Sequence, residues 1–209
     1  MSLPVSAEYL GLSLARDKAV GDLTLRHKRV TELRLPTGKL VATDAFVFTE
    51  PQPFELPLPS GVFPVILAVA HFTNDQRVAF AGIRFRDTPP VAWDMLTLDG
   101  QDSSKLEEGH IFGYGVDSGT GCFIDASAAR VLDRKMAEEP EFYQVMMTEM
   151  ERTYVHTWSW LDMPFGNGNL VAFSSGVGDG AYATYAGFDT DGEIAVVVTD
   201  FSVVPLETT

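Results

Sequence analysis

The sequence predicts a mainly β protein of the α+β class, an antiparallel sandwich or curved sheet with about two central helices packed on one side. Short segments rich in β-branched and aromatic residues recur along most of the chain, and turn residues separate them. Apart from one short helix near the N-terminus, helical periodicity lies in the middle of the chain, between residues 126 and 150. Because no long linker, internal repeat or low-complexity tract interrupts these elements, residues 1–209 are predicted to form a single domain.

The N-terminal half is predicted to begin with a short helix over residues 7–14 and to continue as strands. Strand-like segments lie at residues 22–30, 39–48, 62–71, 77–86 and 91–98. Four prolines between residues 51 and 61 exclude regular structure there, because proline cannot donate a backbone hydrogen bond. Only a short polar gap separates residues 62–71 from 77–86, so we expect these two strands to form a hairpin.

The C-terminal half changes from helical to strand-like periodicity. Asp125 is placed to cap a helix over residues 126–137, whose apolar residues fall on one face. Pro140 ends that helix and can open a second one. Strands are expected at residues 170–174, 181–188 and 193–204. The Asp-Thr-Asp-Gly sequence at 189–192 predicts a turn that joins the last two strands into a hairpin.

Composition predicts a soluble, cytoplasmic protein. A chain of 209 residues that is 45% hydrophobic can bury a substantial core. The single cysteine, Cys122, cannot form an internal disulfide, which is typical of a reducing compartment. The first twenty residues lack the apolar core of a signal peptide, and the apolar stretch at 61–70 is too short to span a bilayer.

Charge is distributed unevenly along the chain, whose net charge is −14. Residues 1–86 contain ten basic and eight acidic side chains, whereas residues 87–209 contain five basic and twenty-one acidic ones. An acidic half repels phosphate backbones, so nucleic-acid binding is not expected. Basic protein surfaces and cations are the partners that this field would favour, although acidity also serves simply to keep a domain dispersed.

Two glycine-rich blocks that contain carboxylates, residues 115–125 and 174–180, form the candidate site. Glycines this dense permit positive φ and close approach of the backbone, and both blocks adjoin apolar segments. The candidate site residues are Asp117, Ser118, Thr120, Cys122, Asp179 and Asp200.

Several chemistries fit parts of this set, each beside a plain structural interpretation. Asp117-Ser118-Gly119-Thr120 has the form of an aspartic protease loop, but a second such loop is absent, and Asp179 or a second copy would have to supply the other carboxylate. A glycine turn capped by Asp117 explains the same residues. Cys122 lies just before a predicted helix, where a thiol can be activated, yet it is followed by two apolar residues and is more typical of a core cysteine.

Metal and phosphate sites receive less support. The segment 189–193 begins like a calcium loop but lacks the terminal glutamate, and the four histidines have no zinc-site spacing. A divalent cation would require the fold to gather Asp117, Asp125, Asp179 and Asp200; no other cofactor is predicted. The glycines do not form a phosphate-binding loop. Tyr154, Trp158 and Trp160 could stack on a ligand, but such residues more often anchor a core.

Several segments resemble domain-of-unknown-function family 4241, a family of uncharacterised bacterial proteins. They are residues 35–44, 59–65, 116–123, 175–180 and 198–201. They occur in order over most of the chain, and Val177 departs from the pattern because an aromatic residue is expected there. The resemblance implies a bacterial soluble protein that forms a single unit, and it implies no activity.

Two functional classes follow from these observations. The first, which the sequence favours, is a binding protein with an acidic recognition face for a basic protein partner, comparable to toxin-neutralising immunity proteins. The second is a small-ligand-binding or hydrolytic protein whose pocket is formed by the two glycine-rich blocks. The lack of a catalytic set favours a protein that is not an enzyme, and the oligomeric state is not readable from the sequence.

Overall fold

Two antiparallel sheets packed face to face form the centre of the molecule in this computed structural model, which describes residues 5–48, 51–107 and 109–206. The larger sheet has the order β1-β2-β4-β5-β13-β12-β6. Its strands are β1 (Lys18–Val20), β2 (Leu23–Leu35), β4 (Gly61–His71), β5 (Gln76–Arg84), β6 (Ala92–Met95), β12 (Thr184–Phe188) and β13 (Ile194–Asp200). The mainly β class predicted from the sequence is therefore confirmed.

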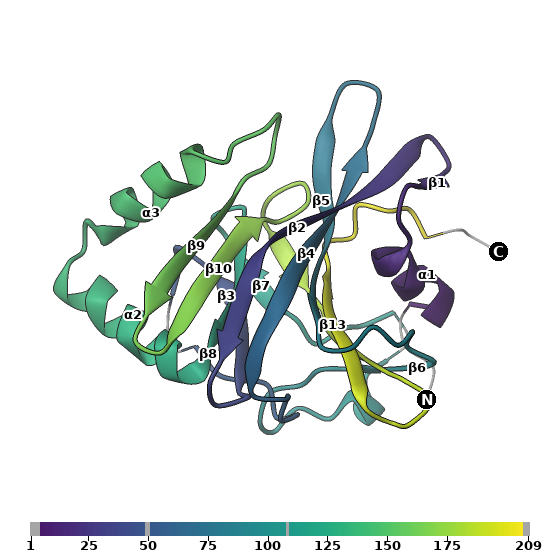
Figure 1. The fold of residues 1–209 in the computed structure, drawn as a ribbon, viewed down its shortest axis with the longest axis horizontal. Coiled ribbons are helices and arrows are strands. Elements are labelled where there is room, and N and C mark those ends of the chain that lie inside the picture. The colour runs from purple at the N-terminus through teal and green to yellow at the C-terminus, as the bar shows by residue number, and fades with distance from the viewer. Residues whose placement is uncertain (1–4, 49–50, 108, 207–209) are drawn as a thin grey trace.

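The second sheet has the order β3-β8-β10-β9 and carries the two central helices. Its strands are β3 (Leu40–Asp44), β8 (Thr120–Asp125), β9 (Trp160–Phe165) and β10 (Gly168–Ser174). The helices are α2 (Ala126–Glu138) and α3 (Phe142–Glu151), and Figure 1 shows both at one end of the molecule. The expected packing of two central helices on one side is thus observed.

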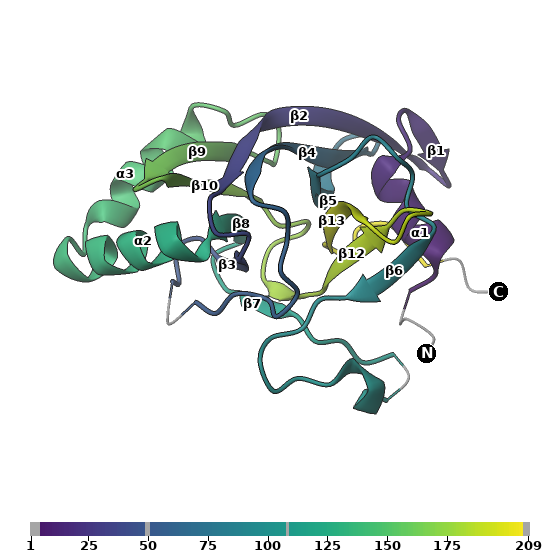
Figure 2. The same cartoon turned by 60° about the horizontal axis from the view of Figure 1, so that its bottom comes forward.

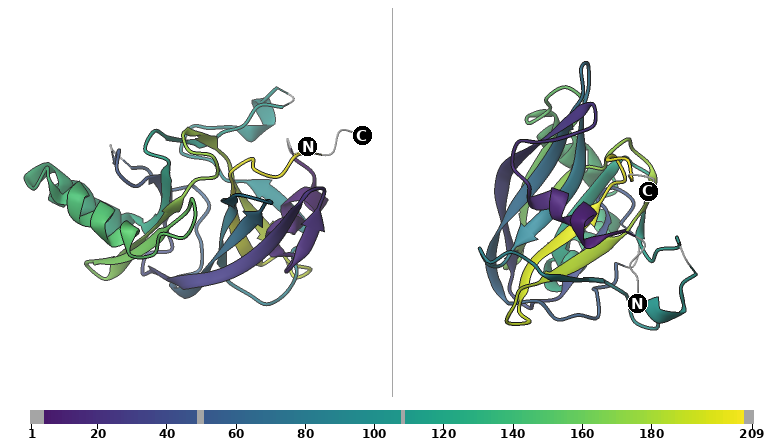
Figure 3. Two further views of the ribbon diagram at one scale, coloured as in Figure 1. Left: turned by 90° about the horizontal axis from the view of Figure 1, so that it is seen from above. Right: turned by 90° about the vertical axis from the view of Figure 1, so that its right-hand side faces the viewer.

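Three apolar clusters hold these layers together. Leu67 and Ile83 of the large sheet meet Phe123, Val171 and Phe173 of the second sheet in the cluster between the sheets. A second cluster lies between the other face of the large sheet and the N-terminal helices α1 (Ala7–Gly11) and η1 (Leu12–Leu14). A third lies between the second sheet and helices α2 and α3. Seen from above, these helices lie at one end of the molecule, and α1 and β1, drawn in purple, lie at the other (Figure 3).

Local signals located several elements correctly. Strands β4 and β5 form the predicted hairpin, and β12 and β13 form the second one. Asp125 caps α2, since its Oδ1 accepts a hydrogen bond of 2.8 Å from the backbone N–H of Ser127. Helix α1 and the short 3-10 helix η1 cover the predicted residues 7–14.

Other boundaries differ from the sequence prediction because partners distant in the chain decide them. Residues 181–188 were predicted as one strand but are divided between β11 (Gly180–Tyr182) and β12, which belong to different sheets. Strand β3 ends at Asp44, earlier than predicted, because the Asp44 side chain accepts hydrogen bonds from the next turn. The short strands β1 and β7 (Tyr114–Val116), together with β8 and β9, were not predicted.

A small two-stranded sheet, β7 with β11, lies beside the main sheets. Figure 2 shows β7 below the second sheet, and the chain between β6 and β7, which contains η2 (Ser103–Lys105), as a loop that projects from the body. The candidate site lies at the end of this small sheet.

Candidate functional site

The small sheet joins the two glycine-rich blocks. Strands β7 and β11 are antiparallel, and Val116 pairs with Gly180 at one end of their ladder. Asp117, which follows Val116, and Asp179, which precedes Gly180, therefore lie just beyond that end. Beyond the ladder, the backbone N–H of Ser175 donates a hydrogen bond of 3.0 Å to the carbonyl oxygen of Gly119. Residues 115–119 and 175–180 therefore form one surface unit, which we call the paired turns.

Glycine is required where the second of these turns reverses. Gly176 has φ +54°, and a Cβ atom at this position would lie 2.9 Å from both the carbonyl oxygen and the Cβ of Phe201. Gly119 also has a positive φ, of +66°. Side chains are disfavoured in this region of backbone space, so the glycines fix the path of both turns.

The buried carboxylate of Asp44 holds the first turn from the end of β3. Its Oδ2 accepts hydrogen bonds of 2.8 Å from the backbone N–H groups of Asp117 and Ser118, and its Oδ1 accepts one of 2.6 Å from the Ser118 hydroxyl. Burial would raise the pKa of Asp44, but the hydrogen bonds from the Ser118 hydroxyl and from backbone N–H groups outweigh it and hold that pKa below its usual range. The carboxylate therefore stays ionised and fixes the turn.

Tyr182 and Ser175 hold the second turn in a similar way. The Tyr182 hydroxyl donates to the carbonyl oxygen of Gly178 at 2.7 Å, and the Ser175 hydroxyl donates to the same oxygen at 2.9 Å. The Tyr182 ring packs edge-on against Phe201, with centroids 4.9 Å apart. The turn is thus anchored in the core between the sheets.

Asp117, Ser118 and Asp179 are exposed at the surface of the paired turns. Val177, between the two glycines of the second turn, is 74% exposed. Among the described residues, the carboxylates of Asp117 and Asp179 accept no hydrogen bond from a side chain or backbone group and form no ion pair. The paired turns consequently present two carboxylates and one apolar side chain to solvent on a fixed backbone.

The remaining predicted site residues do not join this surface. Thr120 is buried, and Cys122 is fully buried in the cluster beneath helices α2 and α3. Burial raises the pKa of the Cys122 thiol well above its usual range, so the thiol stays protonated. A protonated and inaccessible thiol cannot act as a nucleophile in this conformation.

Asp200 lies on the other face of the large sheet, against α1. Its Oδ1 accepts hydrogen bonds from the Tyr9 hydroxyl at 3.2 Å and from the backbone N–H of Ser202 at 2.9 Å. Burial raises the pKa of Asp200 to about 6, and these hydrogen bonds oppose the shift without cancelling it. Tyr9 also donates to the carbonyl oxygen of Val204, so this group ties α1 to the C-terminal segment.

The structure does not gather the acidic residues that a cation site would need. The side chain of Asp125 is fully buried and accepts hydrogen bonds from Thr37 and Ser127. Asp189 lies in the segment that resembles a calcium loop. Its carboxylate accepts hydrogen bonds from the Thr88 hydroxyl and from backbone N–H groups of its own turn. The described part of the chain holds no group of three or more His, Cys, Asp or Glu side chains arranged to bind a metal ion.

The aromatic residues Tyr154, Trp158 and Trp160 do not form one stacking surface. Trp158 is buried between the sheets and donates through Nε1 to Gln76, whereas Tyr154 is 60% exposed. Four surface pockets of about 340 to 670 Å³ are lined by residues outside both glycine-rich blocks. None of these four pockets therefore involves the paired turns.

Asp44 is the residue of this site that sequence reasoning missed. It belongs to one of the segments that carry the family resemblance, but no local pattern connects it to Ser118, which is 74 positions away. An acidic residue that directly follows four apolar or small strand residues was the available signal.

The fold and site define a mainly antiparallel β protein that presents two joined, acidic glycine turns. A family model described as "Protein of unknown function (DUF4241)" matches residues 33–199, and the chain therefore belongs to this family. The matched region includes Asp44 and both glycine-rich blocks. Neither the curated proteins nor the solved structures gave a match to the chain.

No helix within the described ranges combines the length and apolar character needed to cross a membrane.

Proposed function

We propose that this protein is a binding protein that recognises a basic protein partner through the paired turns. The observation that carries the proposal is the exposure of Asp117, Asp179 and Val177 on turns that Asp44 and Tyr182 hold in place from within. A surface that is already ordered loses little conformational entropy when it binds, so more of its interaction energy contributes to affinity.

The charges and the apolar side chain have complementary roles in this proposal. Carboxylates at an interface steer a basic partner towards the site and set its orientation. Val177, on the second turn, supplies an apolar contact that the partner would cover. The net charge of −14 extends the attraction beyond the contact surface, with a strength that salt reduces.

Hydrolysis at the same place receives less support from the geometry. The Cys122 thiol is buried and protonated, and Asp200 lies against α1 instead of beside Asp117. The four pockets of about 340 to 670 Å³ described above do not include the glycine-rich blocks in their linings. Recognition of a macromolecule requires neither an enclosed pocket nor an activated nucleophile.

The test compares two double variants with the same change in net charge. Asp117→Asn with Asp179→Asn alters the paired turns, whereas Asp94→Asn with Asp133→Asn alters exposed positions on β6 and α2. Each immobilised protein is used to capture partners from a native lysate at low and high salt. We expect a basic protein that binds the wild type and the control at low salt, is released at high salt, and is lost with the first variant.

Two results would overturn the proposal. One is the absence of any salt-sensitive basic partner, and the other is equal capture by the two double variants. Melting temperatures separate lost recognition from lost folding. Because the Asp117 and Asp179 side chains are exposed, we expect their replacement to leave the melting temperature nearly unchanged.

A further inference from the structure

We propose that a basic pocket on the α1 face of the large sheet binds a small phosphate-bearing anion. The pocket has a volume of about 400 Å³ and is lined by Arg16, Asp17, His27, Arg29, Ile66 and Arg84. This volume is in the range of small-molecule sites. The site is separate from the paired turns and does not depend on the function proposed for them.

Strand alternation brings two of the basic residues to this face. Leu25 of β2 packs in the cluster beneath α1, and alternate residues along a strand point to the same side. His27 and Arg29 therefore share the α1 face, while Lys28 points the other way and its ammonium lies 5.1 Å from the Trp158 ring. Arg29 pairs with Ile66 of β4, which forms part of the pocket wall.

The other two arginines come from distant parts of the chain. Arg84 ends β5 and pairs with Val196 of β13, and it lines a small cavity together with Ser13 and Leu14 of η1. Arg16 lies in the turn between η1 and β1, where Asp17 has a positive φ of 48°. The His27 ring ties β2 to η1, which directly precedes this turn, through a 2.7 Å hydrogen bond from Nε2 to the carbonyl oxygen of Ser13.

The pocket concentrates positive charge in a protein of net charge −14. Three of the fifteen lysine and arginine residues line it, and Asp17 is its one acidic lining residue among those described. Burial lowers the pKa of His27, and the charges of Arg16 and Arg84 lower it further, so the ring is neutral at pH 7. The lining therefore carries a net charge that matches a phosphate dianion.

The guanidinium groups keep donors available for a ligand. Arg29 contacts Glu32 at 2.6 Å and Arg84 contacts Asp87 at 3.7 Å, but both pairs involve exposed carboxylates and Asp87 is 98% exposed. Exposed pairs of this kind are weak, and each guanidinium has five N–H donors. Arg16 forms no ion pair with any described residue. Planar guanidinium donors match the oxygens of phosphate, which favours this anion class.

His27 shapes the pocket but donates no hydrogen bond to the anion. Because Nε2 donates to Ser13, the neutral ring leaves Nδ1 as a buried acceptor, which has no hydrogen-bond partner among the described residues. The arginine side chains therefore supply the donors for the anion. Residues 16–29 lie outside the region matched by the family model, so that match does not imply this pocket. The assignment rests on the geometry of this chain.

Calorimetry of the full chain at constant ionic strength tests the proposal with inorganic phosphate and with glycerol 3-phosphate. We expect saturable binding of one molecule per chain, and a higher affinity for glycerol 3-phosphate would identify a phosphate monoester as the ligand class. Arg16→Gln and Arg84→Gln should each weaken binding about tenfold or more, because each removes charged hydrogen bonds to the anion. The ring resonances of His27 should shift during the titration.

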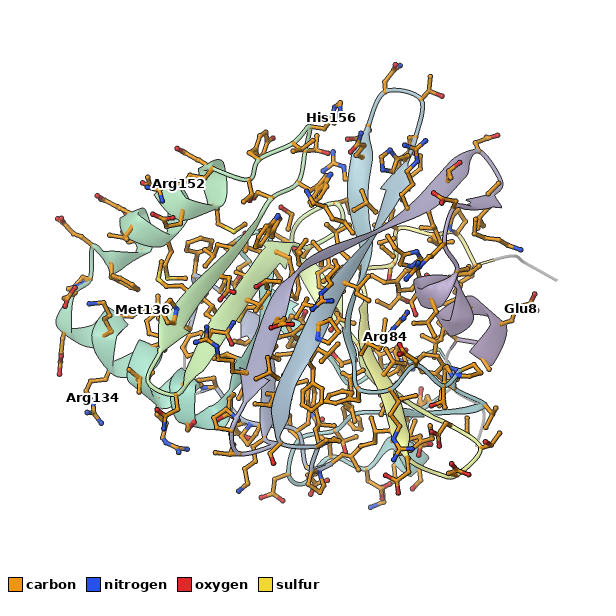
Figure 4. The ribbon with its side chains drawn as sticks, in the orientation of Figure 1. Glu8, Arg84, Arg134, Met136, Arg152 and His156 are labelled. Carbon is orange, nitrogen blue, oxygen red and sulfur yellow. The ribbon has the colours of Figure 1, made fainter. Side chains whose placement is uncertain are left out.

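Arg134→Gln provides the matched control, because it removes one positive charge from the exposed face of α2 at the other end of the molecule (Figure 4). It should bind as the wild type does. If a glutamine variant lowers the melting temperature, Arg16→Lys and Arg84→Lys replace it in the binding measurement, because they keep the positive charge. The proposal is overturned if neither probe saturates, if the pocket variants bind like the wild type, or if Arg134→Gln loses as much affinity as they do.

Discussion

The hydroxyl of Ser118 donates a 2.6 Å hydrogen bond to the buried carboxylate of Asp44, across 74 positions of the chain. The same carboxylate accepts the backbone N–H of Ser118 and of Asp117, together with those of Phe46 and Val47 in its own turn. One side chain thus determines the geometry of two loops. The exposed Asp117 owes its position to a residue that never reaches the surface.

Replacing Asp44 by alanine should destabilise the protein by about 2–4 kcal/mol, because several backbone N–H groups lose a charged acceptor. Urea unfolding measures the change. Asp117→Asn, which alters an exposed carboxylate in the same loop, should cost less than about 0.5 kcal/mol. Equal losses for the two variants would contradict the anchoring role of Asp44.

The pKa of Asp200, which burial raises to about 6, predicts a loss of stability as pH rises. Near pH 4 the carboxyl group is largely protonated in the folded protein. As pH rises towards and past 6, the folded protein must ionise this buried group, which lowers the free energy of unfolding by up to about 3 kcal/mol. Asp200→Asn keeps an acceptor for Tyr9 and cannot ionise. We expect it to melt at a higher temperature than the wild type at about pH 8, and at a similar temperature at about pH 4.

Asp44 should show the opposite dependence of stability on pH. Hydrogen bonds hold the pKa of Asp44 below its usual range, so its contribution is present at neutral pH and is lost as pH falls. A gain from Asp200→Asn that was largest at low pH would show that burial of this carboxyl is not the cause.

Tyr114→Phe should stabilise the protein by about 1 kcal/mol. The Tyr114 hydroxyl is buried and has no partner among the described residues, while the nearby Thr199 hydroxyl is paired with Thr184 at 2.8 Å. Removing an unsatisfied buried polar group eliminates its desolvation cost. Thermal unfolding measures the effect; a loss of stability would reveal a hydrogen bond that phenylalanine cannot replace.

Gly176→Ala should destabilise the protein by about 2 kcal/mol or more, since it combines a positive φ with a Cβ only 2.9 Å from the Phe201 carbonyl oxygen. Gly115→Ala is the matched control in the first block, because its φ is not positive and its Cβ would meet no atom within 4 Å. Chemical denaturation of both variants checks the difference. A cost at position 115 as large as that at position 176 would contradict the steric explanation.

The candidate site was predictable only in part. The two blocks were identified from their glycine density, and the fold does join them at the pair Val116 and Gly180. Cys122 lies within the first block, and the two apolar residues that follow it already favoured the core position that the structure shows. Asp200 was included for its carboxylate, and its burial against α1 depends on packing, which no local pattern encodes.

The sequence by itself determined the mainly β class, the hairpin of β4 and β5, the two central helices and the Asp125 cap. These features depend on alternation, helical periodicity and turn chemistry, which act over a few neighbouring residues. Only the tertiary structure decided that residues 181–188 divide between two sheets, that Asp44 anchors Ser118, and that Arg16 meets Arg84 in one pocket. Pairing across long stretches of chain is fixed by register and by core packing, so it emerges only when the sheets assemble.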